Sequence, residues 1–167
     1  MIIAIILLII SFLLEGFMSI YFPSNLVNPS ILSCLYTLIT LIIIYPYFYN
    51  EKKYYILLII FGLLIDIVYS NTFLFNTILF LLLSIIIKIL NVILPNNIFT
   101  INVKSLIIIM AYHILSFVLL SIVDYNGYTI NLLFDIIINS IIMTLIYTSI
   151  LYFVAKFLFK KYDKLIK

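Results

Sequence analysis

The 167-residue chain contains no arginine and no tryptophan, and it has only one cysteine and one histidine. Charged side chains make up 9% of the chain, whereas they are about a quarter of a soluble protein. So few charges cannot cover the surface of a water-soluble fold, which excludes a soluble domain. The single cysteine, Cys34, excludes an intramolecular disulfide, and we interpret it as a small buried filler. One histidine and one cysteine give little support to a metal site or a cysteine–histidine catalytic pair.

Hydrophobic residues make up 67% of the chain, and the mean hydropathy is +1.39. A spanning helix needs about 20 mainly apolar residues, and six stretches approach that length. The apolar character is continuous around each stretch, which favours helices over a β-barrel. The sequence therefore predicts an all-α fold: one integral membrane domain, residues 1–167, forming a compact bundle of six transmembrane helices. Their expected ranges are 2–22, 30–49, 54–70, 73–94, 103–122 and 129–154.

All nine basic residues are lysines, and six spans place every one of them on the same side of the membrane as both chain ends. The positive-inside rule makes that side cytoplasmic. Five lysines form a basic tail after the last span: Lys156, Lys160, Lys161, Lys164 and Lys167. Four of them recur at helical spacing, so a continuing helix would carry a basic stripe near anionic headgroups. The alternatives are anchoring lysines and a docking site for a cytoplasmic partner.

Polar residues inside the spans are costly in hydrocarbon and are therefore functional candidates. Depth along the helices, at 1.5 Å per residue, places one group of them in the outer half of the membrane: Glu15, Asp66, Asn76, Asp135 and Asn139. One hypothesis is a polar pocket, or a contact surface for another membrane helix. The alternative is hydrogen bonding between the helices of this chain. His113, near the middle of the fifth span, is interpreted as a structural hydrogen-bonder.

Enzyme motifs are not found in the sequence. There is no G-x-S-x-G, H-E-x-x-H, Walker loop or C-x-x-C. Two aspartates could serve an intramembrane aspartyl protease, but the residues around Asp66 and Asp135 form neither a Y-D nor a G-x-G-D pattern. We therefore expect neither catalysis nor a cofactor, and no feature indicates nucleic-acid binding.

The third and fourth spans read Phe61-Gly62-Leu63-Leu64-Ile65-Asp66 and then Ser70-Asn71-Thr72-Phe73-Leu74-Phe75-Asn76. This resembles the family of the rod shape-determining protein MreD, which has a G-L-L-x-D stretch, a short break and a small polar residue early in the next helix. Gly62, Asp66 and Asn76 carry the match. The break departs from the family, which often has S-P-L-G where this chain has Asn71-Thr72-Phe73-Leu74. The last helix and its basic tail also resemble the family.

The resemblance implies a non-enzymatic scaffold of the bacterial cytoplasmic membrane. Members of the family act with a bitopic MreC protein, linking MreB filaments to the peptidoglycan synthase of the elongasome. Gly62 and Asp66 lie four residues apart on one helix face, where glycine allows close approach and aspartate accepts a hydrogen bond. We therefore expect helix packing or partner contact at Gly62, Asp66 and Asn76.

A second reading comes from another functional class. The substrate-binding S components of energy-coupling-factor transporters are also six-helix proteins of similar outline, and they bind vitamins from the outer side. The expected outer polar cluster of Glu15, Asp135 and Asn139 would suit that role. However, the first helix contains a single alanine, Ala4, and so lacks an A-x-x-x-A pattern for docking a transporter partner.

Overall fold

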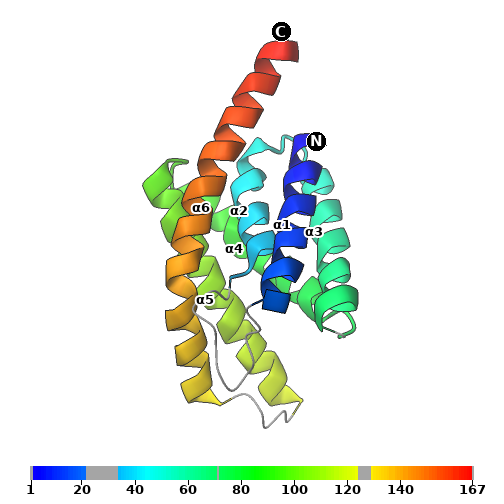
Figure 1. Cartoon of the computed structure of the whole chain (residues 1–167), viewed down its shortest axis with the longest axis vertical. Coiled ribbons are helices and arrows are strands. Elements are labelled where there is room, and N and C mark those ends of the chain that lie inside the picture. Colours follow the sequence, from blue (N-terminus) through cyan, green and yellow to red (C-terminus); the bar gives the residue numbers. More distant parts are fainter. Residues whose placement is uncertain (1, 22–33, 71, 124–128, 167) are drawn as a thin grey trace.

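The computed structural model describes residues 2–21, 34–70, 72–123 and 129–166, with side chains up to residue 161. Every regular element within these residues is a helix (Figure 1), so the all-α prediction is confirmed for them. Five helices are long and apolar enough to cross a membrane, and one apolar helix, with the turn that follows it, is shorter. In chain order the elements are α1 (Ile2–Tyr21), α2 (Tyr36–Ile44), the 3₁₀ turn η1 (Tyr45–Tyr47), α3 (Glu51–Ile65), the π-helical turn η2 (Asp66–Ser70), α4 (Phe75–Ile93), α5 (Ile98–Ile122) and α6 (Ile130–Ile166).

The helices run alternately in opposite directions, so α1 begins at the same end of the bundle at which α6 finishes (Figure 1). We call this the lysine end, because it holds the seven lysines whose side chains are described. They are Lys52, Lys53, Lys88, Lys104, Lys156, Lys160 and Lys161. Positive charge confined to one end, among the described residues, and apolar faces along the helices are the arrangement expected of a multi-pass membrane protein.

Helix α2 forms the centre of the bundle, where it packs against α1, α5 and α6. All nine of its residues are buried. Pro46 lies in η1, where its ring fits a 3₁₀ turn but would interrupt a longer helix. Together α2 and η1 are about 20 Å long at the usual rises per residue, less than the roughly 30 Å of a bilayer core. The sequence predicted a full span over 30–49, of which residues 30–33 lie outside the described part.

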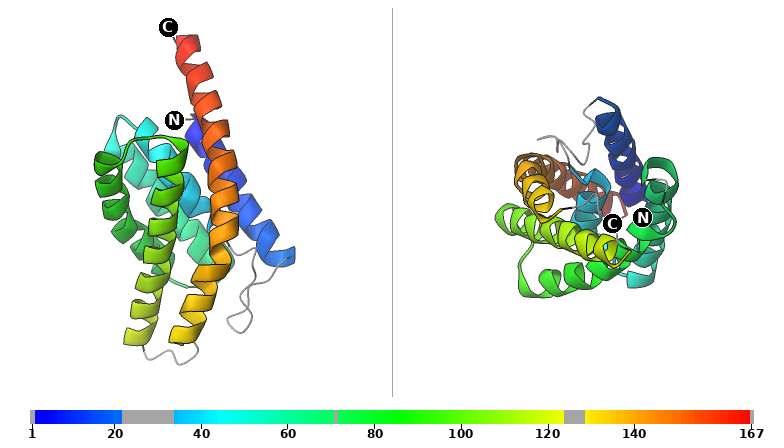
Figure 2. Two further views of the ribbon diagram at one scale, coloured as in Figure 1. Left: turned by 90° about the vertical axis from the view of Figure 1, so that its left-hand side faces the viewer. Right: turned by 90° about the horizontal axis from the view of Figure 1, so that it is seen from below.

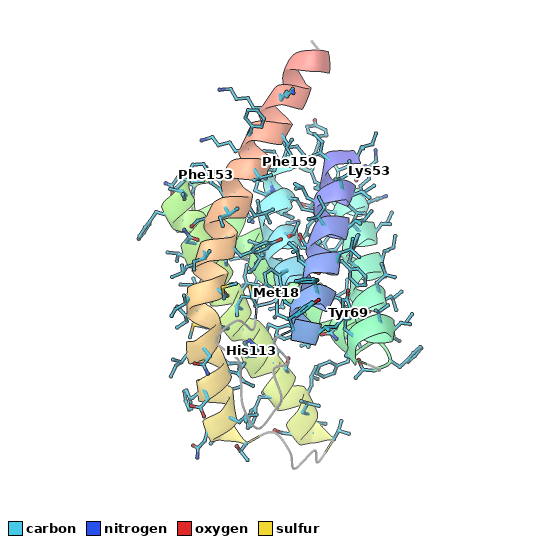
Figure 3. All side chains as sticks on the ribbon, in the orientation of Figure 1. Met18, Lys53, Tyr69, His113, Phe153 and Phe159 are labelled. Carbon is cyan, nitrogen blue, oxygen red and sulfur yellow. The ribbon has the colours of Figure 1, made fainter. Side chains whose placement is uncertain are left out.

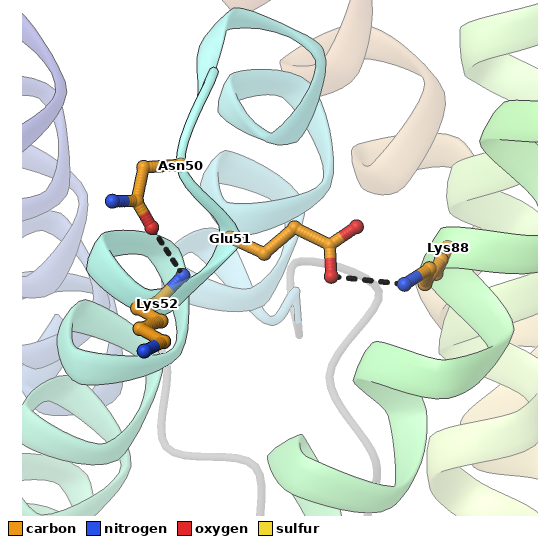
Figure 4. Close-up of polar contacts among 4 residues, drawn as sticks. All are labelled: Asn50, Glu51, Lys52 and Lys88. Atoms are coloured by element: carbon orange, nitrogen blue, oxygen red, sulfur yellow. Dashed lines mark hydrogen bonds and ion pairs between the residues drawn. The ribbon is translucent and has the colours of Figure 1, made fainter.

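Two helices begin earlier than the sequence predicted, because polar residues read as loop act as caps. The side-chain Oδ1 of Asn50 accepts the backbone N–H of Lys52 at 2.9 Å, so α3 begins at Glu51 rather than residue 54 (Figure 4). Asn97 and Thr100 form a reciprocal capping box, so α5 begins at Ile98 rather than residue 103. Each cap satisfies backbone N–H groups that a helix start leaves unpaired.

Helix α6 extends beyond the expected end at residue 154 and continues to Ile166. Its 37 residues correspond to about 55 Å at 1.5 Å per residue, so it projects past the other helices at the lysine end (Figure 2). The ring of Phe159 stacks on Tyr47 with centroids 4.0 Å apart. This contact holds α6 against η1 beyond the expected end of the span.

Large apolar side chains cover the outside of the bundle as well as its core (Figure 3). On α1, for example, Ile9, Ile10, Leu13 and Phe17 are all exposed. Such a surface is unfavourable in water and is matched by lipid.

Candidate functional site: two carboxylates that cap neighbouring helices

Asp66 lies at the junction of α3 and η2, and its side chain is almost completely buried, with 1% exposed. Its Oδ1 accepts hydrogen bonds from the Asn76 backbone N–H at 2.8 Å, Asn76 Nδ2 at 3.0 Å and Thr72 Oγ1 at 2.8 Å. Its Oδ2 accepts bonds from the backbone N–H of Thr77 at 3.0 Å and from Thr77 Oγ1 at 2.9 Å. Both oxygens are therefore fully engaged by groups of this chain.

These bonds supply the cap that α4 otherwise lacks. The residue at the N-cap position is Leu74, whose side chain offers no hydrogen bond and whose φ is 62°. The first N–H groups of a helix have no intrahelical partner, and in hydrocarbon no water replaces it. The carboxylate of Asp66, on the preceding helix, accepts hydrogen bonds from two of these N–H groups, those of Asn76 and Thr77. Loss of an ordinary N-cap costs about 0.5–2 kcal/mol.

Close packing surrounds this carboxylate. A Cβ added to Gly62 would lie 2.8 Å from the Cα of Thr77, so the backbones of α3 and α4 approach too closely for any side chain there. The hydroxyl of Tyr112, on α5, donates to Asn76 Oδ1 at 2.6 Å. The structure therefore brings Gly62, Asp66 and Asn76 together. With Thr77, we call this group the α3–α4 joint.

Glu15 makes a second cap of the same kind. Helix α2 also begins after a leucine, Leu35, with no side-chain cap. Glu15 Oε2, from α1, accepts the backbone N–H of Thr37 at 3.1 Å and its hydroxyl at 2.5 Å. In both caps, one carboxylate oxygen of the preceding helix receives both donors of a threonine in the first turn of the next helix.

The predicted outer-half cluster of Glu15, Asp135 and Asn139 is distributed over different helices. Glu15 is bound to α2, whereas Asp135 lies on an exposed face of α6, and Asn139, one turn further along α6, is half-buried. Among the described residues, no hydrogen bond or ion pair links Glu15 with Asp135. Asp66 and Asn76, predicted at the same depth, belong to the α3–α4 joint.

A hydroxyl network in the core was missed by the sequence analysis. Ser11 Oγ lies 2.5 Å from Thr40 Oγ1 and 2.7 Å from the hydroxyl of Tyr147, joining α1, α2 and α6. Ser11 and Thr40 are fully buried. The available signal was a serine, a threonine and a tyrosine within apolar spans, but such residues are common in membrane helices and do not identify their partners.

The lysine end contains one buried cation and several exposed ones. Lys104 is fully buried, and its amine donates to the side-chain oxygens of Asn91 at 2.9 Å and Asn96 at 2.8 Å. Lys156, Lys160 and Lys161 of the predicted basic tail are exposed on α6. The side chain of Lys164, and Lys167 as a whole, lie outside the described part of the structure.

Two further candidates from the sequence are His113 and Cys34. His113 is half-buried in the lower part of the bundle in Figure 3, with its ring edge-on to that of Tyr112 at 5.4 Å between centroids. Its hydrogen-bonding role stays a prediction. Cys34 is half-buried, with its sulfur 4.0 Å from Thr144 Oγ1.

Glu15 and Asp66 thus act as structural acceptors that join consecutive helices. Within the described residues, no group of three or more histidine, cysteine, aspartate or glutamate side chains could hold a metal ion. Comparison with known proteins finds no matching family model, no matching curated protein and no matching solved structure.

Proposed function

We propose that the protein is a non-enzymatic membrane scaffold of the cell-elongation machinery, similar to MreD, in a bacterial cytoplasmic membrane. It acts by forming a complex with an MreC-like bitopic protein, and through it with an MreB-like filament and the peptidoglycan synthase. The lysine end faces the cytoplasm, with both chain ends on that side.

The conformation of Leu74 carries this proposal. The MreD-like pattern often has glycine at this position, where the chain departs from it. Leu74 is the one described non-glycine residue with a positive φ, 62°. Glycine adopts this left-handed conformation without the steric cost that a side chain brings. The backbone at Leu74 therefore has the conformation that the family's glycine suits, although a leucine at this position gives no indication of it.

The role of Asp66 also supports a scaffold. A carboxylate that binds a substrate or transfers protons needs a free acceptor, whereas Asp66 receives five hydrogen bonds from its own chain. The residues that carry the resemblance thus join α3 to α4 through hydrogen bonds and a close backbone contact. Such a joined helix pair suits a protein that works through helix contacts.

Copurification tests the proposal. The chain is coexpressed with a tagged MreC-like protein from the same genome, and the membranes are solubilised in mild detergent. We expect this chain in the eluate of the MreC-like protein but not in that of an unrelated tagged bitopic protein of similar length. Its depletion should also turn rod-shaped cells round.

A vitamin-binding S component is the competing function. If the protein is an S component, denaturing the purified protein should release a vitamin that mass spectrometry identifies. A transporter ATPase should then copurify in place of the MreC-like protein. That result would overturn the scaffold proposal.

A further inference from the structure

The outward face of α6 carries a stripe of exposed apolar side chains that leads directly into lysines. Ile146, Ile150, Phe153 and Phe157 are between 49% and 67% exposed. Two exposed lysines, Lys160 and Lys161, follow Phe157 at three and four residues, the spacing that keeps side chains on one face of a helix. One continuous surface thus changes from apolar to cationic within a single turn.

This change occurs at the level where the other helices end. The hydroxyl of Tyr152 donates to the backbone oxygen of Asn96, in the connection between α4 and α5, at 3.2 Å. One turn later, the amine of Lys156 lies 5.6 Å from the centroid of the Tyr152 ring. Phe159 then stacks on Tyr47 of η1. The helix is therefore fixed against the bundle on one side while its opposite face is open.

The dimensions of the surface match one lipid leaflet. Residues 146 to 157 span about 16 Å of helix, close to half of a roughly 30 Å hydrocarbon core. Lysine side chains at the end of such a stripe lie at the level of the headgroup phosphates. We infer that this surface is a binding site for an anionic phospholipid, whose chains lie along Ile146, Ile150, Phe153 and Phe157 and whose phosphate lies at Lys160 and Lys161. We call it the α6 lipid site.

A phospholipid satisfies the two halves of this surface together. The acidic surface of a soluble protein could neutralise Lys160 and Lys161, but it would leave the rings of Phe153 and Phe157 without an apolar partner. Among the described side chains, the ion pair at this end joins Glu51 to Lys88 at 2.9 Å (Figure 4). Two adjacent lysines without a described acidic partner favour a headgroup with net negative charge.

Lipid selection measured on the purified wild-type protein tests the site without any partner protein, so its outcome is separate from the proposed scaffold function. The protein is placed in nanodiscs with equal amounts of phosphatidylglycerol and phosphatidylcholine, then released into mild detergent. Retained lipids are counted by native mass spectrometry. We expect retention of phosphatidylglycerol over phosphatidylcholine, reduced in 1 M salt because the attraction is electrostatic.

The chain offers a closely matched control, because two other adjacent exposed lysines lie at the same end of the bundle. The test variant is K160Q/K161Q and the control is K52Q/K53Q, each removing two charges from exposed positions. The test pair should lower the preference for phosphatidylglycerol by about 25-fold, at roughly fivefold per lysine. The control pair should leave it unchanged, and K160R/K161R should retain it.

Two results would overturn the site. An equal loss in K52Q/K53Q would assign the preference to the overall positive charge of the lysine end. An unchanged preference in K160Q/K161Q, or no preference in the wild-type protein, would assign the surface to another occupant, such as a second copy of the chain or an acidic cytoplasmic protein.

Discussion

At Leu74 the backbone has a conformation that its side chain does not favour. A left-handed residue with a Cβ costs about 1–2 kcal/mol, and Leu74 is only half-buried, so its packing offsets little of this cost. The sequence still folds this way because the turn must bring the first N–H groups of α4 to Asp66.

Leu74→Gly should therefore stabilise the protein, by about 1 kcal/mol. Leu81→Gly is the control, since Leu81 lies in the regular interior of α4, where glycine costs about 0.5–1 kcal/mol relative to alanine and the loss of the leucine side chain adds to that cost. Both are measured by SDS titration in mixed micelles, followed by circular dichroism. Equal destabilisation by the two glycines would contradict the assigned strain.

Asp66→Asn should destabilise the fold because an amide NH₂ replaces one of the two acceptor oxygens. Donors of Asn76 or Thr77 would then face another donor while buried, which costs about 1–3 kcal/mol. Asp135→Asn makes the same chemical change on an exposed face of α6 and should alter stability by less than about 0.5 kcal/mol. The same SDS titration compares them, and equal effects would remove Asp66 from its capping role.

The sequence identified Asp66 and Glu15 as side chains that are unfavourable in hydrocarbon, but it did not identify the groups that they bind. Their threonine partners lie 11 and 22 residues away, on the next helix in each case. Nothing distinguishes Thr37 and Thr77 from other threonines in apolar spans. The missing caps at Leu35 and Leu74 were the available clue, and they could be read only once the helix starts were known.

At the scale of helices, the contact between α3 and α4 depends on Gly62. A methyl group there would lie 2.8 Å from the Cα of Thr77, which is backbone and cannot move aside. Gly62→Ala should therefore separate the helices and destabilise by about 1–3 kcal/mol.

Gly16→Ala is the matched control, because the atoms that its Cβ would meet belong to the side chain of Tyr69, which can shift more easily than backbone even though its hydroxyl donates to the Phe12 carbonyl. We expect a smaller loss of stability in the SDS titration. A loss in Gly16→Ala equal to that in Gly62→Ala would show that the backbone contact has no special importance.

Hydrophobicity predicted the existence and order of the helices. Where each helix begins depends on caps, and which helix lies at the centre depends on burial. Asn97 and Thr100, read as loop, begin α5. The burial of α2 could not be predicted, because lipid-facing and protein-facing residues are equally apolar. Ile42 is fully buried and Ile9 is exposed, yet both are isoleucines in apolar runs. In water the difference would appear as an amphipathic pattern.

For the whole molecule, the collection of lysines at one end predicts the orientation of every helix. Reporters placed at Gly127 and at Lys167 should be found on opposite sides of the membrane, with the second in the cytoplasm. A reporter after Asn50 should match the one at Lys167. Compartment-specific enzymatic reporters measure this, and finding those at Gly127 and Lys167 in one compartment would refute the orientation.

The enclosure of α2 has a consequence for biogenesis. Helix α2 packs against α1, which is synthesised before it, and against α5 and α6, which are synthesised well after it. A segment of about 20 Å cannot partition into lipid as a full-length span does. The packing around α2 is therefore complete only once α6 has been synthesised. Until then Thr40 and Ser11 lack the Tyr147 hydroxyl, so stalled or truncated chains should present α2 to membrane proteases.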